Sequence, residues 1–188
     1  MKDQYVITIA RGYGSGGRTM GKLLSEELGI HYYDRELLRL ASDESGINES
    51  IFEKADEKLK KSILYKIARK EYNFQAKVIK GLADQESCVI VGRCADYILR
   101  DRENVVKIFV HASLEDCVGR LVDMYSLSKS ELEKKIKRID KRRADYYKYF
   151  TGREWNTAQN YDLCLNSQQL GYDKCIEIVK NYLEVRFS

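Results

Sequence analysis

Short apolar runs and longer amphipathic segments alternate along this chain. The clearest apolar runs cover 5–10, 88–91 and 105–110, and each is followed directly by a glycine, a histidine or an arginine. Short runs that are apolar almost throughout are typical of parallel strands covered on both faces. Two weaker candidates, at 30–33 and 161–165, complete the set of five predicted strands.

The segments between these strands have the spacing of amphipathic helices. In the segment after the first strand, apolar residues recur at helical intervals and Gly29 closes the pattern. Ser128 and Glu131 form a capping-box pattern at the start of another helix. The predicted helices cover 18–29, 35–42, a segment capped by Asn48, about 57–84, 114–124, 128–149 and 171–186.

The repeated order of strand and helix predicts an α/β fold. Right-handed crossovers between successive strands give an open, mostly parallel five-stranded sheet with helices on both faces, which is a three-layer sandwich. Ligands of such sheets bind at the carboxyl ends of the strands. We therefore look for chemistry in the loops that follow each strand.

Composition limits the classes of protein that this chain can belong to. Its 188 residues suit one domain, and no apolar run approaches the roughly 20 residues that cross a membrane. No secretory leader is visible, so we expect a cytoplasmic protein. The five cysteines are odd in number and form no C-x-x-C pair, which argues against a disulfide framework or a zinc site.

The loop after the first strand carries the strongest chemical signal. Residues 12–19 read Gly-Tyr-Gly-Ser-Gly-Gly-Arg-Thr, which fits the phosphate-binding pattern G-x-x-x-x-G-K-[ST] except that Arg18 replaces the lysine. Glycines permit positive φ and leave no Cβ between the loop amides and an anion. A polyphosphate held there also lies at a helix N-terminus, which favours negative charge. The alternative is a glycine-rich turn without a ligand.

Arg18 and Thr19 have distinct expected roles in this loop. Thr19 is predicted to face a magnesium ion through its hydroxyl. Arg18 keeps a positive charge, but its planar guanidinium reaches phosphate oxygens differently from a compact ammonium group. Turnover therefore does not follow from the loop pattern alone.

Charged residues also follow the other predicted strands. Arg93 comes directly after a buried strand and Gly92, which is an unusual place for a long cation unless an anion or a carboxylate meets it there. The alternative is an ion pair with Asp34 or Asp96. These two carboxylates are candidates to orient a magnesium-bound water or a substrate hydroxyl, and each is also an ordinary helix N-cap.

Positive charge is concentrated in 134–143, although the net charge of the whole chain is only +4. Most such runs are solvated helix faces. The two other interpretations are a clamp for polyphosphate and a patch for nucleic acid, and the glycine loop favours the clamp. We do not expect nucleic acid to be the ligand.

Aromatic residues gather towards the end of the chain, in 146–150, at Trp155 and at Tyr161. They can either stack on a base or pack a helix against the last strand. Packing is the commoner use of such a stripe, and we expect it here.

Several motifs in their order along the chain resemble the cytidylate kinase-like family, which belongs with the P-loop nucleoside monophosphate kinases. They span nearly the whole sequence: residues 7–18 with the glycine loop, Tyr-Tyr-Asp-Arg-Glu-Leu at 32–37, Gly-Arg at 92–93, and Tyr-Asp-Leu-Cys-Leu-Asn-Ser at 161–167. The resemblance implies a P-loop kinase fold in a single domain over 1–188. It also implies an acceptor-binding helical region at about 34–86 and a helical lid at about 125–158.

By this resemblance, the chain binds ATP and Mg²⁺ and transfers a phosphoryl group by positioning and electrostatics, without a protein nucleophile. Asp140 is placed to organise the arginines of the lid. The expected ATP-binding residues are Gly12, Gly14, Ser15, Gly16, Gly17, Arg18, Thr19 and Arg120; the expected catalytic residues are Arg18, Arg138, Arg142 and Arg143; and the expected acceptor-binding residues are Asp34, Arg35, Arg93 and Asp96.

The motifs differ from those of true cytidylate kinases at three places. Those enzymes carry lysine in the glycine loop, an Asp-Ser-Gly-like turn after the second strand, and Gly-Arg-Asp after the third. This chain has Arg18, Asp-Arg-Glu at 34–36, and Gly-Arg-Cys at 92–94. These differences leave the base specificity open. The resemblance implies an acceptor that is a nucleoside monophosphate, CMP-like, or a related small metabolite.

The competing hypothesis is a nucleotide-binding module without turnover that has a regulatory or partner-binding role. The sequence is compatible with a homo-oligomer.

Overall fold

The computed structural model describes residues 4–34 and 61–188. The helices predicted at 35–42 and after Asn48, and the start of the one predicted from about 57, lie outside these residues. The strands are β1 (Val6–Arg11), β2 (His31–Tyr33), β3 (Cys88–Val91), β4 (Val105–His111) and β5 (Leu163–Asn166). The helices are α1 (Gly17–Leu28), α4 (Lys61–Gln85), α5 (Ala95–Ile98), α6 (Leu114–Val122), α7 (Lys129–Thr151), the 3₁₀ turn η1 (Ala158–Asn160) and α8 (Ser167–Phe187).

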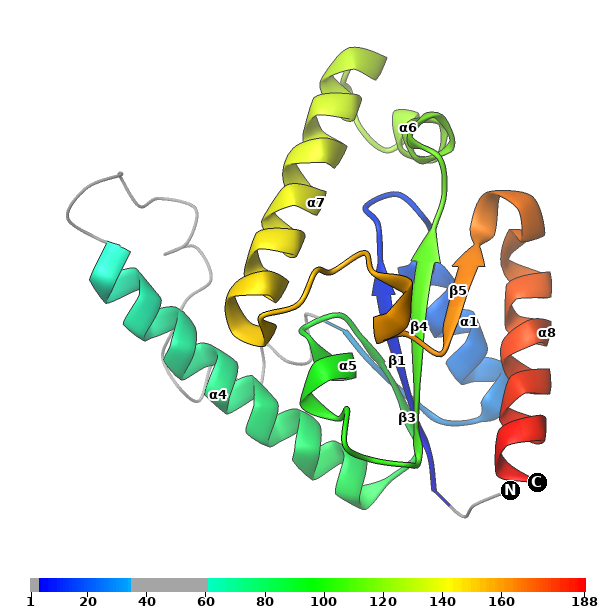
Figure 1. Ribbon diagram of the computed structural model, residues 1–188. Helices are drawn as coiled ribbons and strands as arrows, with labels where there is room; N and C mark the ends of the chain where they lie inside the picture. The colour runs from blue at the N-terminus through cyan, green and yellow to red at the C-terminus, as the bar shows by residue number, and fades with distance from the viewer. Residues whose placement is uncertain (1–3, 35–60) are drawn as a thin grey trace.

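The five strands form one sheet in the order β2-β3-β1-β4-β5, and every pair of neighbours is parallel. The central strand β1 pairs Ile7 with Val89 of β3 on one side and with Val106 of β4 on the other. Since all strands run the same way, the loops after them meet at one edge (Figure 1). This confirms the predicted α/β sandwich with a parallel five-stranded sheet.

Alternation along the strands divides the core between two faces of the sheet. Ile7, Val89 and Val106 face α1 and α8, where they join Met20 and Val179 in one buried cluster. The adjacent strand residues face the other side, and Figure 1 shows α1 and α8 together against the first face. This two-sided burial explains why the strands read as continuous apolar runs.

The second face of the sheet is covered by α4, α5 and the end of α7. Val6 and Ile90 of the strands pack there against Ile79 of α4, Ile98 of α5 and Tyr147 of α7. Side chains of α6 and of the start of α7 form a separate small cluster. Figure 1 shows these two segments beyond the carboxyl edge of the sheet. The helices α6 and α7 therefore extend over the edge where the loops converge.

Details at the ends of elements differ from the sequence predictions. The short helix α5 was not predicted, because Ala95–Ile98 is too short to show a helical period. α8 begins at Ser167, four residues before the predicted start, and Gly171 interrupts it with φ of 71°. The predicted capping box at Ser128 and Glu131 is confirmed at the start of α7.

Candidate active site

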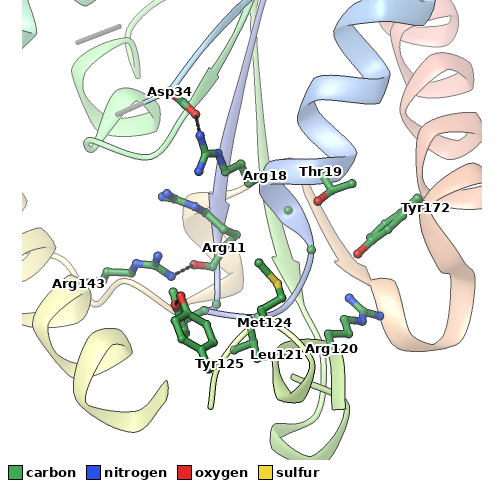
Figure 2. A pocket seen from close by; sticks show the side chains of 15 residues that line it. Arg11, Arg18, Thr19, Asp34, Arg120, Leu121, Met124, Tyr125, Arg143 and Tyr172 are labelled. Atoms are coloured by element: carbon green, nitrogen blue, oxygen red, sulfur yellow. Dashed lines mark hydrogen bonds and ion pairs between the residues drawn. The ribbon is translucent and has the colours of Figure 1, made fainter. Parts of the chain in front are cut away.

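A cavity of about 560 Å³ lies at the carboxyl edge of the sheet, around the glycine loop. Its lining comes from the loop itself, from the end of β2, and from α6, α7 and α8 (Figure 2). Four arginines and one carboxylate are among the lining residues, so the cavity suits an anion. It is lined by Arg11, Gly12, Tyr13, Gly14, Gly16, Gly17, Arg18, Thr19, Asp34, Arg120, Leu121, Met124, Tyr125, Arg143 and Tyr172.

The glycines of the loop are required by its backbone and by its close neighbours. Gly14 and Gly16 have φ of 82° and 79°, which side chains rarely adopt. A Cβ at Gly14 would lie 2.9 Å from the Cβ of Cys117, and one at Gly16 would overlap the ring of Tyr172. A Cβ at Gly17 would lie 2.6 Å from the Cβ of Arg11. The loop is therefore built for its tight path.

The backbone N–H groups that follow the loop are available to a ligand. Those of Gly16, Gly17, Arg18 and Thr19 donate no hydrogen bond within residues 4–34 and 61–188. They lie at the start of α1, where unpaired donors and the helix dipole favour negative charge. This is the arrangement that holds phosphate groups at helix N-termini.

Buried hydrogen bonds fix the outer turn of the loop. The Ser15 hydroxyl donates to the Gly12 carbonyl at 2.9 Å. The Ser15 carbonyl in turn accepts from the Ser167 hydroxyl at 2.6 Å and from Arg120 Nη1 at 2.8 Å. The loop is thereby tied to the start of α8 and to α6, which pre-organises its free amides.

Helix α7 contacts the loop through Asp140 and Arg143. Asp140 Oδ1 accepts from the Tyr13 amide at 2.8 Å and from Arg143 Nη1 at 3.2 Å. Arg143 Nη1 also donates to the Arg11 carbonyl at 3.1 Å. Burial raises the pKa of Asp140, against the opposing effects of these donors. Asp140 thus organises Arg143, as the sequence suggested.

Arg18 is turned towards the end of β2. Its Nη2 lies 2.7 Å from Asp34 Oδ2, and Figure 2 shows this ion pair at one end of the cavity. The Arg18 side chain is 68% exposed, whereas that of Asp34 is 10% exposed. The neighbouring Asp34 carboxylate raises the pKa of Arg18. The cation that stands at the lysine position is therefore engaged by a carboxylate of the protein.

Arg120 lies at the other end of the cavity, beside α8. Its Nη2 is 2.7 Å from Asp116 Oδ2, and its guanidinium lies 5.5 Å from the centre of the Tyr172 ring. Figure 2 shows Arg120 and Tyr172 on the side of the loop opposite Arg18 and Asp34. Leu121 and Met124 line the cavity next to them. This end offers an apolar and aromatic surface to a ligand.

Arg11 was not predicted as a site residue, although it lines the cavity. Its guanidinium makes no hydrogen bond or ion pair with any residue that the structure describes. Burial, followed by the charge of Arg143, lowers its pKa to about 9. The signal in the sequence was the same as at Arg93, namely a long cation directly after a buried strand and next to a glycine.

The other predicted site residues do not line this cavity. Arg138 and Arg142 are exposed on α7, and Arg35 lies outside the described residues. Arg93 follows Gly92 with φ of 60°, near enough to Arg11 to affect its pKa. Their roles stay predictions.

Asp96 is buried within the fold. Its Oδ2 accepts from the Tyr147 hydroxyl at 2.6 Å, and burial raises its pKa.

The aromatic residues near the end of the chain pack within the fold. Tyr147 is a core residue, and the rings of Trp155 and Phe109 pack edge to face. The prediction that these aromatic residues pack is thus confirmed.

A magnesium ion fits this cavity only with help from a bound phosphate. Thr19 is exposed and lines the cavity, so its hydroxyl is available as one ligand. In the described part of the chain, no three His, Cys, Asp or Glu side chains are grouped to hold a metal. Magnesium commonly keeps few protein ligands and completes its shell with phosphate oxygens and water. The residues present are compatible with that mode.

No helix among residues 4–34 and 61–188 has the length and apolar character needed to span a membrane.

Comparison with known proteins places the chain in a family. A cytidylate kinase from Pyrococcus horikoshii is 26% identical over 180 residues, which are 95% of this chain and 88% of that protein. An uncharacterized protein from Eubacterium ventriosum has a solved structure with a TM-score of 0.76 and 27% identity, over 96% of this chain and 99% of that one.

Shikimate kinase from Bacteroides thetaiotaomicron superposes with a TM-score of 0.61 at 15% identity, over 96% of this chain and 98% of that one. At this identity the likeness shows the fold alone. The description of the cytidylate kinase-like family matches residues 6–169, which include the glycine loop, the cavity-lining part of α7 and the end of β5. The chain belongs to the cytidylate kinase-like family.

Proposed function

We propose that the chain is a kinase that transfers a phosphoryl group from ATP, with Mg²⁺, to a nucleoside monophosphate such as CMP. The observation that carries the proposal is the cavity around the glycine loop, which combines free backbone amides with four arginines. Family membership and the fold support a kinase acting on a small metabolite. The relative named cytidylate kinase supports CMP as the first acceptor to test.

In this proposal the two ends of the cavity hold different parts of the substrates. The amides of Gly16 to Thr19 bind the donor phosphates, and Thr19 would hold the magnesium ion. Arg120 and Tyr172 border the end where the donor nucleoside packs. Asp34 and the arginines near it face the acceptor.

Arg143 is the arginine of α7 best placed to act on the transferring group. It lines the cavity, and Asp140 and the Arg11 carbonyl hold its Nη1 beside the loop. Charge spreads over the oxygens of the phosphoryl group during transfer, and a fixed guanidinium stabilises it.

We extend the proposal to the organisation of the chain: a single domain with a lid at about 125–158 and an acceptor-binding region at about 34–86.

The test is ADP formation from ATP and magnesium with a panel of nucleoside monophosphates, with CMP, dCMP and UMP foremost. We expect turnover with at least one of them and its loss when magnesium is chelated. ATP binding without ADP formation from any acceptor would contradict the proposal.

The second candidate is a nucleotide-binding module without turnover. The observation that favours it is the Arg18–Asp34 ion pair, which engages the cation of the glycine loop. Arg18→Lys tests this alternative, because lysine restores the usual loop residue. If the ion pair blocks catalysis, Arg18→Lys creates activity that the wild-type chain lacks. If the loop is built around the guanidinium, the substitution lowers the activity already present.

A further inference from the structure

The four arginines of the cavity differ in how they are neutralised. Arg18 pairs with Asp34, Arg120 with Asp116, and Arg143 with Asp140. Only Arg11, among the cavity arginines, has no carboxylate or carbonyl partner for its guanidinium in the described part of the chain. A buried cation without a partner is costly, so such a group usually has a partner that arrives with the ligand.

The structure makes room for the Arg11 side chain at two glycines. A Cβ at Gly17 would lie 2.6 Å from the Arg11 Cβ, and a Cβ at Gly92 would overlap Arg11 Nη1. Gly92 has φ of 82°, so its backbone also favours glycine. The stem of Arg11 thus passes Gly17 at the end of the phosphate loop, and its guanidinium lies beside Gly92, which follows β3.

The surroundings of Arg11 belong to the acceptor side of the cavity. The charged and titratable groups that act on its pKa are Arg143 of α7, Tyr32 and Asp34 at the end of β2, and Arg93 after β3. Figure 2 shows the Arg11 side chain directed towards Arg143 and the Arg18–Asp34 pair, away from Arg120 and Tyr172. Positive charge exceeds negative charge among these groups.

We propose that Arg11 is a phosphate-binding residue that contacts the phosphate of the acceptor, so that the acceptor is a phosphate monoester and not an uncharged hydroxyl compound. This inference rests on the proposed kinase function. Arg11 supplies the free cation that Arg18 does not supply while it is paired with Asp34. A guanidinium binds phosphate through two parallel N–H bonds, which also orients the group for attack.

The donor phosphates are the other source of the same chemistry, and the position of Arg11 argues against them. The free amides of Gly16 to Thr19 already serve the donor at the start of α1. Arg11 precedes the loop and lies beside Gly92, at the end of the neighbouring strand β3. A ligand group there is shared between the loop and the acceptor side.

The experiment compares the wild-type chain with Arg11→Met, Arg11→Lys and a control, Arg102→Met. Met keeps the length of the side chain and removes its charge. Arg102 pairs with Asp84 at 2.8 Å, between the end of α4 and the start of β4, which is the opposite edge of the sheet. Calorimetric titrations use CMP, ATP with magnesium, and inorganic phosphate as the three ligands.

We expect Arg11→Met to weaken CMP binding by about tenfold to a hundredfold and ATP binding by less than about threefold, as the loss of one charge-assisted contact predicts. Arg11→Lys should fall between Arg11→Met and the wild type, and Arg102→Met should match the wild type. A loss confined to ATP would overturn the acceptor assignment. Unchanged binding of every ligand in Arg11→Met would overturn the whole inference.

The inorganic phosphate titration separates this inference from the proposed function. If the wild-type chain binds no CMP, the proposed acceptor is wrong. A phosphate affinity that falls in Arg11→Met and not in Arg102→Met then still supports Arg11 as a phosphate ligand. No phosphate binding by the wild-type chain, or equal binding by both variants, would overturn it.

Discussion

The two ends of the cavity use the same residue type in opposite ways. At the α8 end, Arg120 is saturated by protein groups: it bonds to Ser15, to Ser167 and to Asp116, and lies over the Tyr172 ring. At the β2 and β3 end, Arg11 has no such partner among the described residues. Arg120 therefore stabilises the loop, whereas Arg11 is available to a ligand.

Because of this difference, some substitutions should affect the structure of the loop and others the binding and transfer of phosphate. Arg120 fixes the loop from outside, so its loss should disturb the loop and donor binding together. Arg11 and Arg143 lie beside the loop where we propose that the phosphates bind, so their loss should affect acceptor binding or transfer.

The largest effect is expected from Gly17→Val, because this substitution distorts the glycine loop, which lies between the two ends of the cavity. The new Cβ would lie 2.6 Å from the Arg11 Cβ and 3.2 Å from the Val110 Cβ, so the start of α1 and the loop before it would have to shift. We expect ATP affinity to fall by about a hundredfold or more, measured by calorimetry. Gly81→Ala is the control, because nothing lies within 4 Å of the added Cβ. Unchanged ATP affinity in Gly17→Val would mean that the glycine loop does not bind ATP.

The next largest effect is expected from Arg143→Met on the acceptor end. Turnover should fall by about a hundredfold or more, because a fixed guanidinium no longer meets the transferring group. ATP affinity should change by less than about threefold. Single-turnover ADP formation beside calorimetry measures both. Equal losses of affinity and rate would place Arg143 with Arg120 as a structural arginine.

Arg142→Ala sharpens this test, because the sequence suggested Arg142 as strongly as Arg143. The Arg142 side chain is exposed and does not line the cavity. We expect a smaller loss of turnover than in Arg143→Met. A larger loss would mean that α7 brings Arg142 in when substrates bind.

Arg120→Met should have an intermediate effect of the opposite kind. It removes the hydrogen bond to the Ser15 carbonyl and leaves the partly buried Asp116 without its cation. We expect ATP affinity to fall about tenfold and the free energy of unfolding to drop by about 1–3 kcal/mol. Calorimetry and thermal unfolding measure the two. Retained affinity with lost turnover would exchange the roles assigned to the two ends.

Arg11→Met is expected to change stability by a similar amount, with the reverse sign. The pKa of Arg11 is lowered to about 9 by burial, the charge of Arg143 and that of Arg93, against the opposing effects of Tyr32 and Asp34. At pH 7 both the folded and unfolded chains carry this proton, so the full cost of the buried charge is present. Arg11→Met should therefore raise the free energy of unfolding at pH 7 by about 1–3 kcal/mol.

The pH dependence of this difference follows from the same pKa. Above about pH 9 the folded state loses the Arg11 proton before the unfolded state does. The free energy of unfolding of the wild type therefore rises relative to that of Arg11→Met as the pH increases. Denaturant unfolding of both chains at pH 7 and pH 10 measures it. A destabilised Arg11→Met at pH 7 would mean that Arg11 holds the fold together and is not held for a ligand.

The sequence predicted the sheet and the loop because burial on both faces leaves a direct trace. The β1, β3 and β4 strands read as apolar runs, and the glycine spacing at 12–17 can serve few other purposes. The short helix α5 and the kink at Gly171 leave no such trace, since their ends depend on tertiary contacts.

The arginines of the site show where sequence reasoning reaches its limit. Neighbouring residues of one helix point in different directions, so the basic run of α7 could not show that Arg143 lines the cavity while Arg138 and Arg142 are exposed. The pairing of Arg18 with Asp34 depends on β2 lying two strands away from β1, which no local pattern encodes.

Whether the acceptor end of the cavity binds a phosphate monoester is tested by comparing nucleoside monophosphates with their own nucleosides as acceptors. ADP formation from ATP and magnesium is followed with CMP and cytidine, dCMP and deoxycytidine, and UMP and uridine. We expect turnover with at least one monophosphate and none with its nucleoside, because the unpaired guanidinium of Arg11 requires a phosphate. Equal rates with a monophosphate and its nucleoside, or no ADP with any monophosphate, would contradict it.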